Sequence, residues 1–227
     1  MTPKITIIYE DNHLLVVEKP VNIPSQEDET GDTDILTLLK TDIKERYGKP
    51  GNVFIGLVHR LDRPVGGVMV FAKTSKAASR LSEQVRTRQF KKTYMAVIHG
   101  IPASRDTLFK DFLLKDNRTN MVRVVTENTE GAKEAVLEYS IVGSINNMSL
   151  VRINLHTGRP HQIRVQFAQR GYPLYGDQKY GSGVNKPGQQ LALWSVEITL
   201  KHPTRGEDMT FGSTPPNKEP WSWFGII

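Results

Sequence analysis

The chain has 227 residues, of which 38% are hydrophobic and 24% are charged, as in a globular protein with a sizeable buried core. It contains no cysteine, which excludes disulfides, thiolate zinc sites and a cysteine nucleophile. The net charge of +6 favours an anionic partner, and no apolar run approaches the roughly 18 residues that a membrane span needs, so we expect a cytoplasmic protein.

Apolar residues that alternate or run together predict strands. In chain order, the strands are expected at residues 5–20 (two strands with a turn at Asp11–Asn12), 67–72, 92–100, 135–141, 149–155 and 191–200. Amphipathic spacing between cap residues predicts three helices. The first is expected to be capped by Thr33 or Asp34, the second by Thr74 or Ser75, and the third to begin at Pro160. The expected core-facing residues are Leu36, Leu39 and Ile43 in the first helix, Ala78, Leu81 and Val85 in the second, and Ile163 and Phe167 in the third.

The grouping of strands with few helices, without a regular βα repeat, predicts an α+β fold with a largely antiparallel sheet. No linker or internal repeat divides the chain, so we expect a single domain over residues 1–227. The charges are segregated: residues 10–34 contain eight acids and one base, whereas residues 73–92 contain seven bases and one acid. This pattern predicts a positive face for an anionic polymer, although a solvated helix surface would give the same composition.

One segment, HRLDRPVGG, places Asp62 between Arg60 and Arg63, directly after His59. A neighbouring guanidinium favours the ionised form of a carboxylate, as an acid that acts as nucleophile or base requires. A salt-bridged structural acid before a strand would have the same neighbours. On spacing alone the two interpretations are equally good.

A second segment, HTGRPHQIR, combines Arg159, His161, Gln162 and Arg164 at the expected start of a helix. Exposed helix N–H groups together with arginine and histidine suit a phosphate or a carboxylate, so Arg164 is a candidate partner for Asp62. Ordinary surface histidines would also fit this position.

In the third segment, KKTYMAV, Tyr94 follows Lys91 and Lys92 on a predicted strand, where it can stack on a base, move a proton or simply pack. The sequence contains no P-loop, no GxGxxG after a strand, no GxSxG and no HExxH. We therefore expect neither a cofactor nor a metal.

Taken together, these segments resemble the RluA-type pseudouridine synthases. The resemblance is carried by DNHLLVVEKP, HRLDRPVGGVMVFAKT, KKTYMAVIHG, LHTGRPHQIRVQFAQRGYPLYGDQKYG and LALWSVEITLKHP, which follow the family's order over residues 8–203. Val65, Gly66 and Gln166 stand where relatives commonly have Thr, Ser and His. The resemblance implies the pseudouridine synthase fold, with flanking helices and an RNA-binding cleft, and without the S4 domain that many relatives carry.

The resemblance also implies the roles of individual residues. Asp62 would be the catalytic aspartate, Tyr94 the tyrosine that packs on the base, and Arg164 the arginine paired with Asp62. The residues expected to contact RNA are His59, Arg60, Arg63, Lys73, Lys91, Lys92, Arg159, His161 and Gln162. The implied reaction converts uridines of ribosomal or transfer RNA to pseudouridine without a cofactor, and we expect the protein to act as a monomer.

Two other functions remain open on the sequence. A catalytically silent RNA-binding protein on the same scaffold would bind RNA and form no product. A nucleoside glycosidase with one carboxylate would release a free base and would depend little on salt. The aromatic C-terminal segment 215–227 is expected to pack back onto the core rather than to stack on bases.

Overall fold

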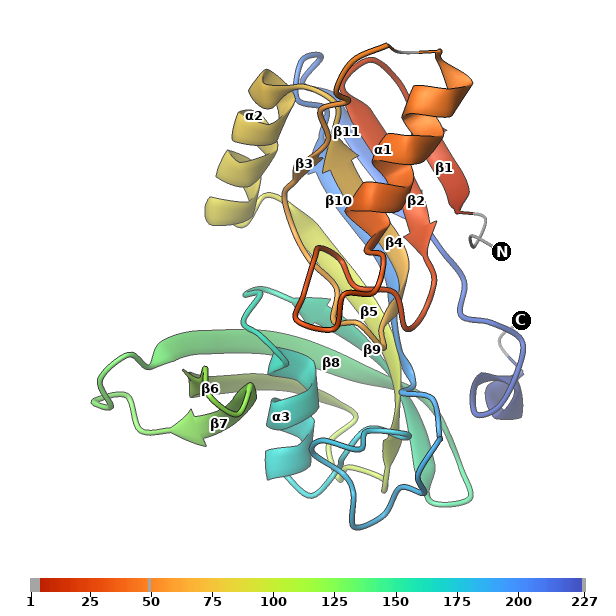
Figure 1. The fold of residues 1–227 in the computed structure, drawn as a ribbon. Coiled ribbons are helices and arrows are strands. Elements are labelled where there is room, and N and C mark those ends of the chain that lie inside the picture. The colour runs from red at the N-terminus through yellow and green to blue at the C-terminus, as the bar shows by residue number, and fades with distance from the viewer. Residues whose placement is uncertain (1–4, 49, 226–227) are drawn as a thin grey trace. The chain divides into compact units, whose positions relative to one another are not determined.

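The computed structural model describes residues 5–48 and 50–225, which form two compact units. The first unit contains the residues up to Lys91 together with Ser195–Ser213, and the second contains Lys92–Trp194 and the segment from Thr214 onward. Each unit combines strands with helices (Figure 1). All strand registers described are antiparallel, so the predicted α+β class with a largely antiparallel sheet is confirmed.

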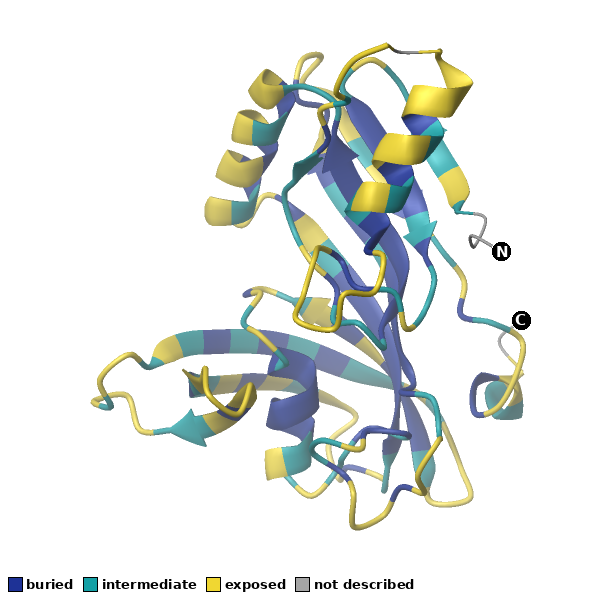
Figure 2. Ribbon diagram, in the orientation of Figure 1, coloured by how far each residue is buried: buried dark blue, intermediate teal, exposed yellow. Residues whose placement is uncertain are grey.

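The sheet of the first unit is built around a fully buried strand. Its strands are β1 (Thr6–Glu10), β2 (Leu14–Lys19), β3 (Gly56–Leu57), β4 (Gly66–Ala72), β10 (Leu193–Lys201) and β11 (Asp208–Gly212). The order is β1-β2-β4-β10, with β3 paired to β4 and β11 paired to β10. All seven residues of β4 are buried, as its continuous apolar run predicts (Figure 2).

Helix α1 (Ile35–Arg46) begins after Asp34, whose carboxylate accepts a hydrogen bond from the backbone N–H of Thr37 at 3.1 Å. Its buried residues are Ile35, Leu39 and Ile43. The prediction that Leu36 faces the core is therefore wrong by one residue, because Ile35 takes that position at the start of the helix.

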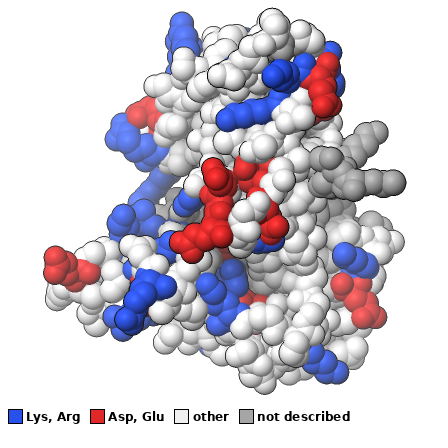
Figure 3. Space-filling view, in the orientation of Figure 1, with Lys and Arg blue, Asp and Glu red and all other residues white. Residues whose placement is uncertain are grey.

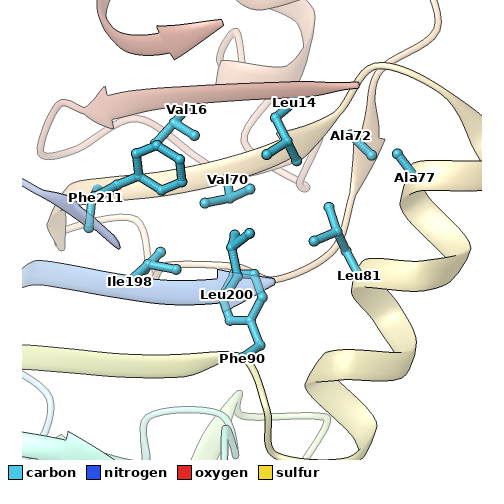
Figure 4. Packing of buried hydrophobic residues seen from close by; sticks show 11 residues of the cluster. Leu14, Val16, Val70, Ala72, Ala77, Leu81, Phe90, Ile198, Leu200 and Phe211 are labelled. Carbon is cyan, nitrogen blue, oxygen red and sulfur yellow. The ribbon is translucent and has the colours of Figure 1, made fainter. Parts of the chain in front are cut away.

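Helix α2 (Ser75–Arg86) begins after Thr74, whose hydroxyl accepts a hydrogen bond from the N–H of Ala77. Ala77 and Leu81 are fully buried, whereas Ala78 and Val85 are only partly buried at the edge of the same core. That core joins α2 to one face of the sheet through Leu14, Val16, Val68, Val70, Ala72, Phe90, Ile198, Leu200 and Phe211 (Figure 4).

The second unit contains the longest strands. Its elements are β5 (Lys91–His99), β6 (Asp106–Asp116), β7 (Met121–Val125), β8 (Lys133–Ile145), β9 (Met148–Leu155), helix α3 (Gln162–Gln169) and a 3₁₀ turn, η1 (Trp221–Phe224). The strand order is β5-β9-β8-β6-β7. Strands β6 and β7 were not predicted from the sequence.

The aromatic C-terminal segment packs onto the second unit, as predicted. Trp221 is buried, and the ring of Trp223 lies edge-on to Tyr175 at 5.5 Å between centroids. The ring of Phe224 lies against Gly143 of β8. Trp221, Trp223 and Phe224 therefore pack against the protein itself. Residues 226 and 227 lie outside the described residues.

Gly67 shows why a glycine is needed at the start of β4. Its φ of +113° lies in a region that side chains disfavour, and an added Cβ would lie 2.2 Å from the carbonyl oxygen of Ser195. This close approach brings β4 against the returning segment of the first unit. It also fixes the backbone directly after the loop that carries Asp62.

Candidate active site

Asp62 lies on the loop between β3 and β4, and that loop is tied down on both sides of the carboxylate. The hydroxyl of Ser25 donates to the carbonyl of Leu61 at 2.6 Å and accepts from the N–H of Leu61 at 3.2 Å. The carbonyl of Asp62 accepts from the N–H of Val65 at 2.9 Å. Leu61 is buried while Asp62 is half-buried, so the loop presents the acid from a fixed backbone.

A fully buried lysine lies behind the same loop. The Nζ of Lys19 donates to the carbonyl oxygens of Pro20 at 2.9 Å, Ile23 at 2.7 Å and Arg63 at 3.2 Å. Burial lowers the pKa of Lys19 to about 7, although the negative charge of Asp62 opposes the shift. Lys19 therefore connects two loops and contributes positive charge near the acid.

Sequence reasoning missed this role of Lys19 and counted it only as the single base among the acids of residues 10–34. The available signal was the Lys19–Pro20 pair at the end of DNHLLVVEKP, one of the segments that carry the resemblance.

The side chain of His59, on the same loop, contacts β4 and Phe90. Its Nε2 accepts a hydrogen bond from the N–H of Val70 at 2.9 Å, and its ring lies 5.1 Å from that of Phe90. A neutral imidazole that accepts at Nε2 carries its proton on Nδ1. These contacts describe a structural role, and the predicted contact with RNA stays a prediction.

Two arginines beside Asp62 contact an acidic loop, residues 26–32. Arg63 forms an ion pair with Asp32 and donates to the hydroxyl of Thr30 at 3.0 Å. Arg60 lies 3.4 Å from the Oε1 of Gln26. Figure 3 shows acidic side chains gathered over this loop. An RNA phosphate would compete with these contacts for the two arginines.

Lys73, also predicted to bind RNA, has an acidic partner in the first unit. Its Nζ lies 2.6 Å from the carboxylate of Glu10 and 5.4 Å from the centre of the Tyr47 ring. Both charged side chains are largely buried. A phosphate would compete with Glu10 for this lysine, and the predicted contact with RNA is untested.

The second unit contains Tyr94 and Arg164. Tyr94 lies on β5, paired with Ile153 of β9, and is buried. Because side chains alternate along a strand, Tyr94 shares a face of β5 with Lys92 and not with Lys91. Lys92 is half-buried and Lys91 is exposed. The two predicted lysines therefore have different environments.

Arg164 forms a buried, bidentate ion pair with Asp177. The two nitrogen–oxygen distances, from Nε and from Nη2, are both 2.8 Å, and the two residues are 7% and 1% exposed. Burial raises the pKa of Asp177, but the bonds and charge of Arg164, with the N–H groups of Lys179 and Tyr180, outweigh it and leave that pKa lowered. The pair fixes the plane of the guanidinium.

Asp177 was missed as a partner of Arg164. It is the acid of the G-D pair in GYPLYGDQKYG, and that pair was the available signal. The predicted pair between Arg164 and Asp62 joins residues of different units, and it stays a prediction.

The loop that carries Asp177 is organised by a buried asparagine. The Oδ1 of Asn185 accepts from the N–H of Gly176 at 2.7 Å and lies 2.8 Å from the Nε2 of His99. Its Nδ2 donates to the carbonyls of Leu174 at 2.9 Å and Gly181 at 3.0 Å. One side chain thus satisfies backbone groups on both sides of Asp177.

The HTGRPHQ segment forms a tight turn before α3. The Oε1 of Gln162 accepts from the hydroxyl of Thr157 at 2.8 Å and from the N–H of Arg159 at 3.0 Å. His161 caps the helix in the left-handed conformation, with φ 51°, and its Nδ1 lies 2.8 Å from the hydroxyl of Tyr180. The prediction that the helix begins at Pro160 is wrong, because the left-handed residue delays the first helical turn to Gln162.

No helix in the described part of the chain is both long and apolar enough to cross a membrane. Among residues 5–48 and 50–225, no group of three or more histidine, aspartate and glutamate side chains is arranged to hold a metal ion.

Comparison with known proteins identifies the family. Residues 13–169 match the family model described as RNA pseudouridylate synthase. The chain is 33% identical over 207 residues to the uncharacterized RNA pseudouridine synthase YhcT of Bacillus subtilis, covering 90% of this chain but only 66% of that protein. It is 32% identical to the dual-specificity RNA pseudouridine synthase RluA of Haemophilus influenzae, with 94% of each chain covered.

The fold agrees with this assignment. The structure of human RNA pseudouridylate synthase domain containing 4 superposes with a TM-score of 0.79 at 23% identity, over 97% of this chain and 91% of that one. The predicted family and its enzyme class, isomerases that act on RNA, are confirmed. The chain belongs to the RNA pseudouridylate synthase family and is similar to its RluA-type members.

Proposed function

We propose that this protein is an RNA pseudouridine synthase that isomerises specific uridines of ribosomal or transfer RNA, with Asp62 acting at the target nucleoside and without a cofactor. The observation that carries the proposal is the presentation of Asp62. The acid is half-buried on a loop tied by Ser25 and Lys19, within the segment that matches the family model. A fixed backbone keeps a reacting group in position without ordering it at each turnover.

In the proposed reaction, the carboxylate of Asp62 attacks or deprotonates at the target nucleoside. The bond between the ribose and the uracil nitrogen breaks, the uracil turns, and a ring carbon bonds to the ribose. That carbon loses its proton and the freed nitrogen gains one, so the product is an isomer of the substrate. Tyr94 packs on the base, and Arg164, oriented by Asp177, pairs with Asp62 to keep it ionised. The target nucleotide must leave its stack to be reached, which costs a few kcal/mol.

RNA binding in the proposal is mainly electrostatic, through phosphates. The proposed contacts are His59, Arg60, Arg63, Lys73, Lys91, Lys92, Arg159, His161 and Gln162. Phosphate contacts give affinity without sequence information, so they do not indicate which uridine is chosen. The proposal includes a single catalytic domain that works as a monomer in the cytoplasm.

The proposal is tested with purified protein and RNA transcripts, by measuring pseudouridine formation. Asp62→Asn keeps the shape of the side chain and removes its charge. We expect the rate to fall by two to four orders of magnitude, roughly the contribution of a positioned catalytic group. Asp42→Asn, which removes an acid from the surface of α1, is the control and should keep the normal rate.

An Asp62→Asn variant with the normal rate would refute the role of Asp62. If the wild-type protein binds RNA without forming pseudouridine, the silent RNA-binding protein is the better description. If it releases free uracil from a nucleoside, the glycosidase is. Mapping pseudouridine in total RNA from cells with and without the protein would identify the substrate.

A further inference from the structure

The turn formed by residues 157–159 has an ammonium group beside it that lacks an acceptor. Lys92 is half-buried on β5, and a methyl group built on Gly158 would lie 2.9 Å from its Nζ. No described residue forms a hydrogen bond or an ion pair with Lys92. Removing an ammonium from water without a partner is unfavourable, so its retention in this position needs a reason.

The environment of Lys92 contains little negative charge to compensate it. Burial lowers the pKa of Lys92 to about 8, and no neighbouring charge contributes to that shift. The amine nevertheless remains mainly protonated at neutral pH. The cation is therefore available for an external anion.

A second unsatisfied donor lies at the same turn. Gln162 is 2% exposed, and its Oε1 is bonded to Thr157 and Arg159, which places its amide beneath the turn. Its Nε2 is buried without a hydrogen-bond partner among the described residues. Buried polar groups are usually paired, so an unpaired donor at this turn calls for an explanation.

Arg159 adds further positive charge from the turn itself. Its Nε donates to the carbonyl of Glu134 at 2.8 Å, which leaves its two Nη groups without a partner among the described residues. Since the turn combines two cations with few acceptors, it suits a phosphate group. A neutral base or a sugar would leave both charges uncompensated.

We infer that the 157–159 turn is a binding site for one backbone phosphate of the RNA substrate, with Lys92 as the direct cation and Gln162 as the residue that positions the turn. The inference rests on the proposed function and narrows it, because it assigns one phosphate of the RNA to one turn among the proposed contacts. Since Lys92 shares a face of β5 with Tyr94, the phosphate belongs to the nucleotides nearest the target base.

The test compares the RNA affinity of the Lys92→Met variant with that of the protein that keeps Lys92, over a range of salt concentrations. Both proteins also carry Asp62→Asn, so that no product forms during the measurement. We expect binding to weaken by about tenfold or more, as for the loss of a charge-assisted hydrogen bond. The slope of log affinity against log salt should fall by about 0.7, as for one phosphate contact on a single strand. Lys40→Met, which removes an exposed charge from α1, should change affinity by less than about twofold.

Unfolding of the same variants gives an independent readout. Because the ammonium of Lys92 is half-buried without a partner among the described residues, Lys92→Met should be at least as stable as the wild type while it binds RNA more weakly. If Lys92→Met matches Lys40→Met in affinity and salt slope, the phosphate site is refuted.

The two proposals can fail separately. A wild-type protein that forms pseudouridine, with a Lys92→Met variant that binds RNA normally, overturns the inference alone. A wild-type protein that forms no pseudouridine but loses RNA affinity selectively on Lys92→Met substitution overturns the proposed function alone.

Discussion

Replacing Asp177 by Asn should destabilise the second unit strongly. The Oδ1 of Asp177 accepts from Nη2 of Arg164 and from the N–H groups of Lys179 and Tyr180, while Oδ2 accepts from Nε of Arg164. An asparagine that keeps its oxygen at the Oδ1 position turns its NH₂ group toward Nε. Two donors then face each other, and the buried guanidinium of Arg164 loses the negative charge of Asp177.

The expected loss follows from the burial of the pair. Arg164 and Asp177 are 7% and 1% exposed, and breaking such a buried pair from one side typically costs about 3–5 kcal/mol. For a chain of this size that corresponds to a fall in Tm on the order of 10 °C. Asp208→Asn breaks an exposed pair with Lys201 and should cost less than about 1 kcal/mol. Urea and thermal unfolding of the three proteins would give these values.

The stability that Asp177 contributes should depend on pH, in a direction set by its pKa shift. The pKa of Asp177 is lowered in the folded protein, so its contribution to stability is present above its ordinary pKa and is lost as the pH falls through the folded value. The difference in stability between wild type and Asp177→Asn should therefore stay constant from pH 7 down to about the ordinary carboxyl pKa of 3.8, and shrink below that pH. A loss below about 1 kcal/mol at pH 7, or a difference that persists at low pH, would contradict the role given to this pair.

Two further changes test other parts of the first unit. Gly67→Ala should lower the free energy of unfolding by several kcal/mol, because the residue has φ +113° and the new methyl group would lie 2.2 Å from a backbone carbonyl oxygen. Thermal unfolding would measure the loss. Gly183→Ala is the control that should be tolerated, because its methyl group would meet nothing within 4 Å. Asp32→Asn should tighten RNA binding by about two- to fivefold, because it frees Arg63 from an exposed ion pair. Glu83→Gln breaks a similar pair on α2 and should leave the affinity for RNA unchanged. Equal effects of the two variants in a binding titration would mean that only the net charge of the protein matters.

Local patterns predicted most of the elements. The hairpin at the N-terminus, α1, α2 and the central strand β4 follow from caps and apolar spacing, which act over a few residues. Strands β6 and β7 were missed because charged residues interrupt them, and their apolar face is narrow: Phe109 and Leu113 are the buried residues of β6. Strand β6 is fixed by pairing with β8, which lies further along the chain, and β7 is fixed by pairing with β6.

The site was predicted less completely than the fold, because charged partners are chosen by tertiary packing. Asp62, Tyr94 and Arg164 stand out by their sequence surroundings, but nothing local connects Arg164 with Asp177 in a loop thirteen residues later. Likewise, no local pattern shows that Lys19 inserts its amine among three carbonyl oxygens.

The bonds of Asn185 have a practical consequence for labelling the protein. Because this side chain ties Leu174, Gly176 and Gly181 together, the spacing between them cannot change without releasing Asp177. The residues just before it, 182–184, are exposed, and Val184 is 56% exposed. A fluorophore on a cysteine introduced at 184, in a chain that has no other thiol, would therefore report on events near Asp177 from a position outside its hydrogen-bond network.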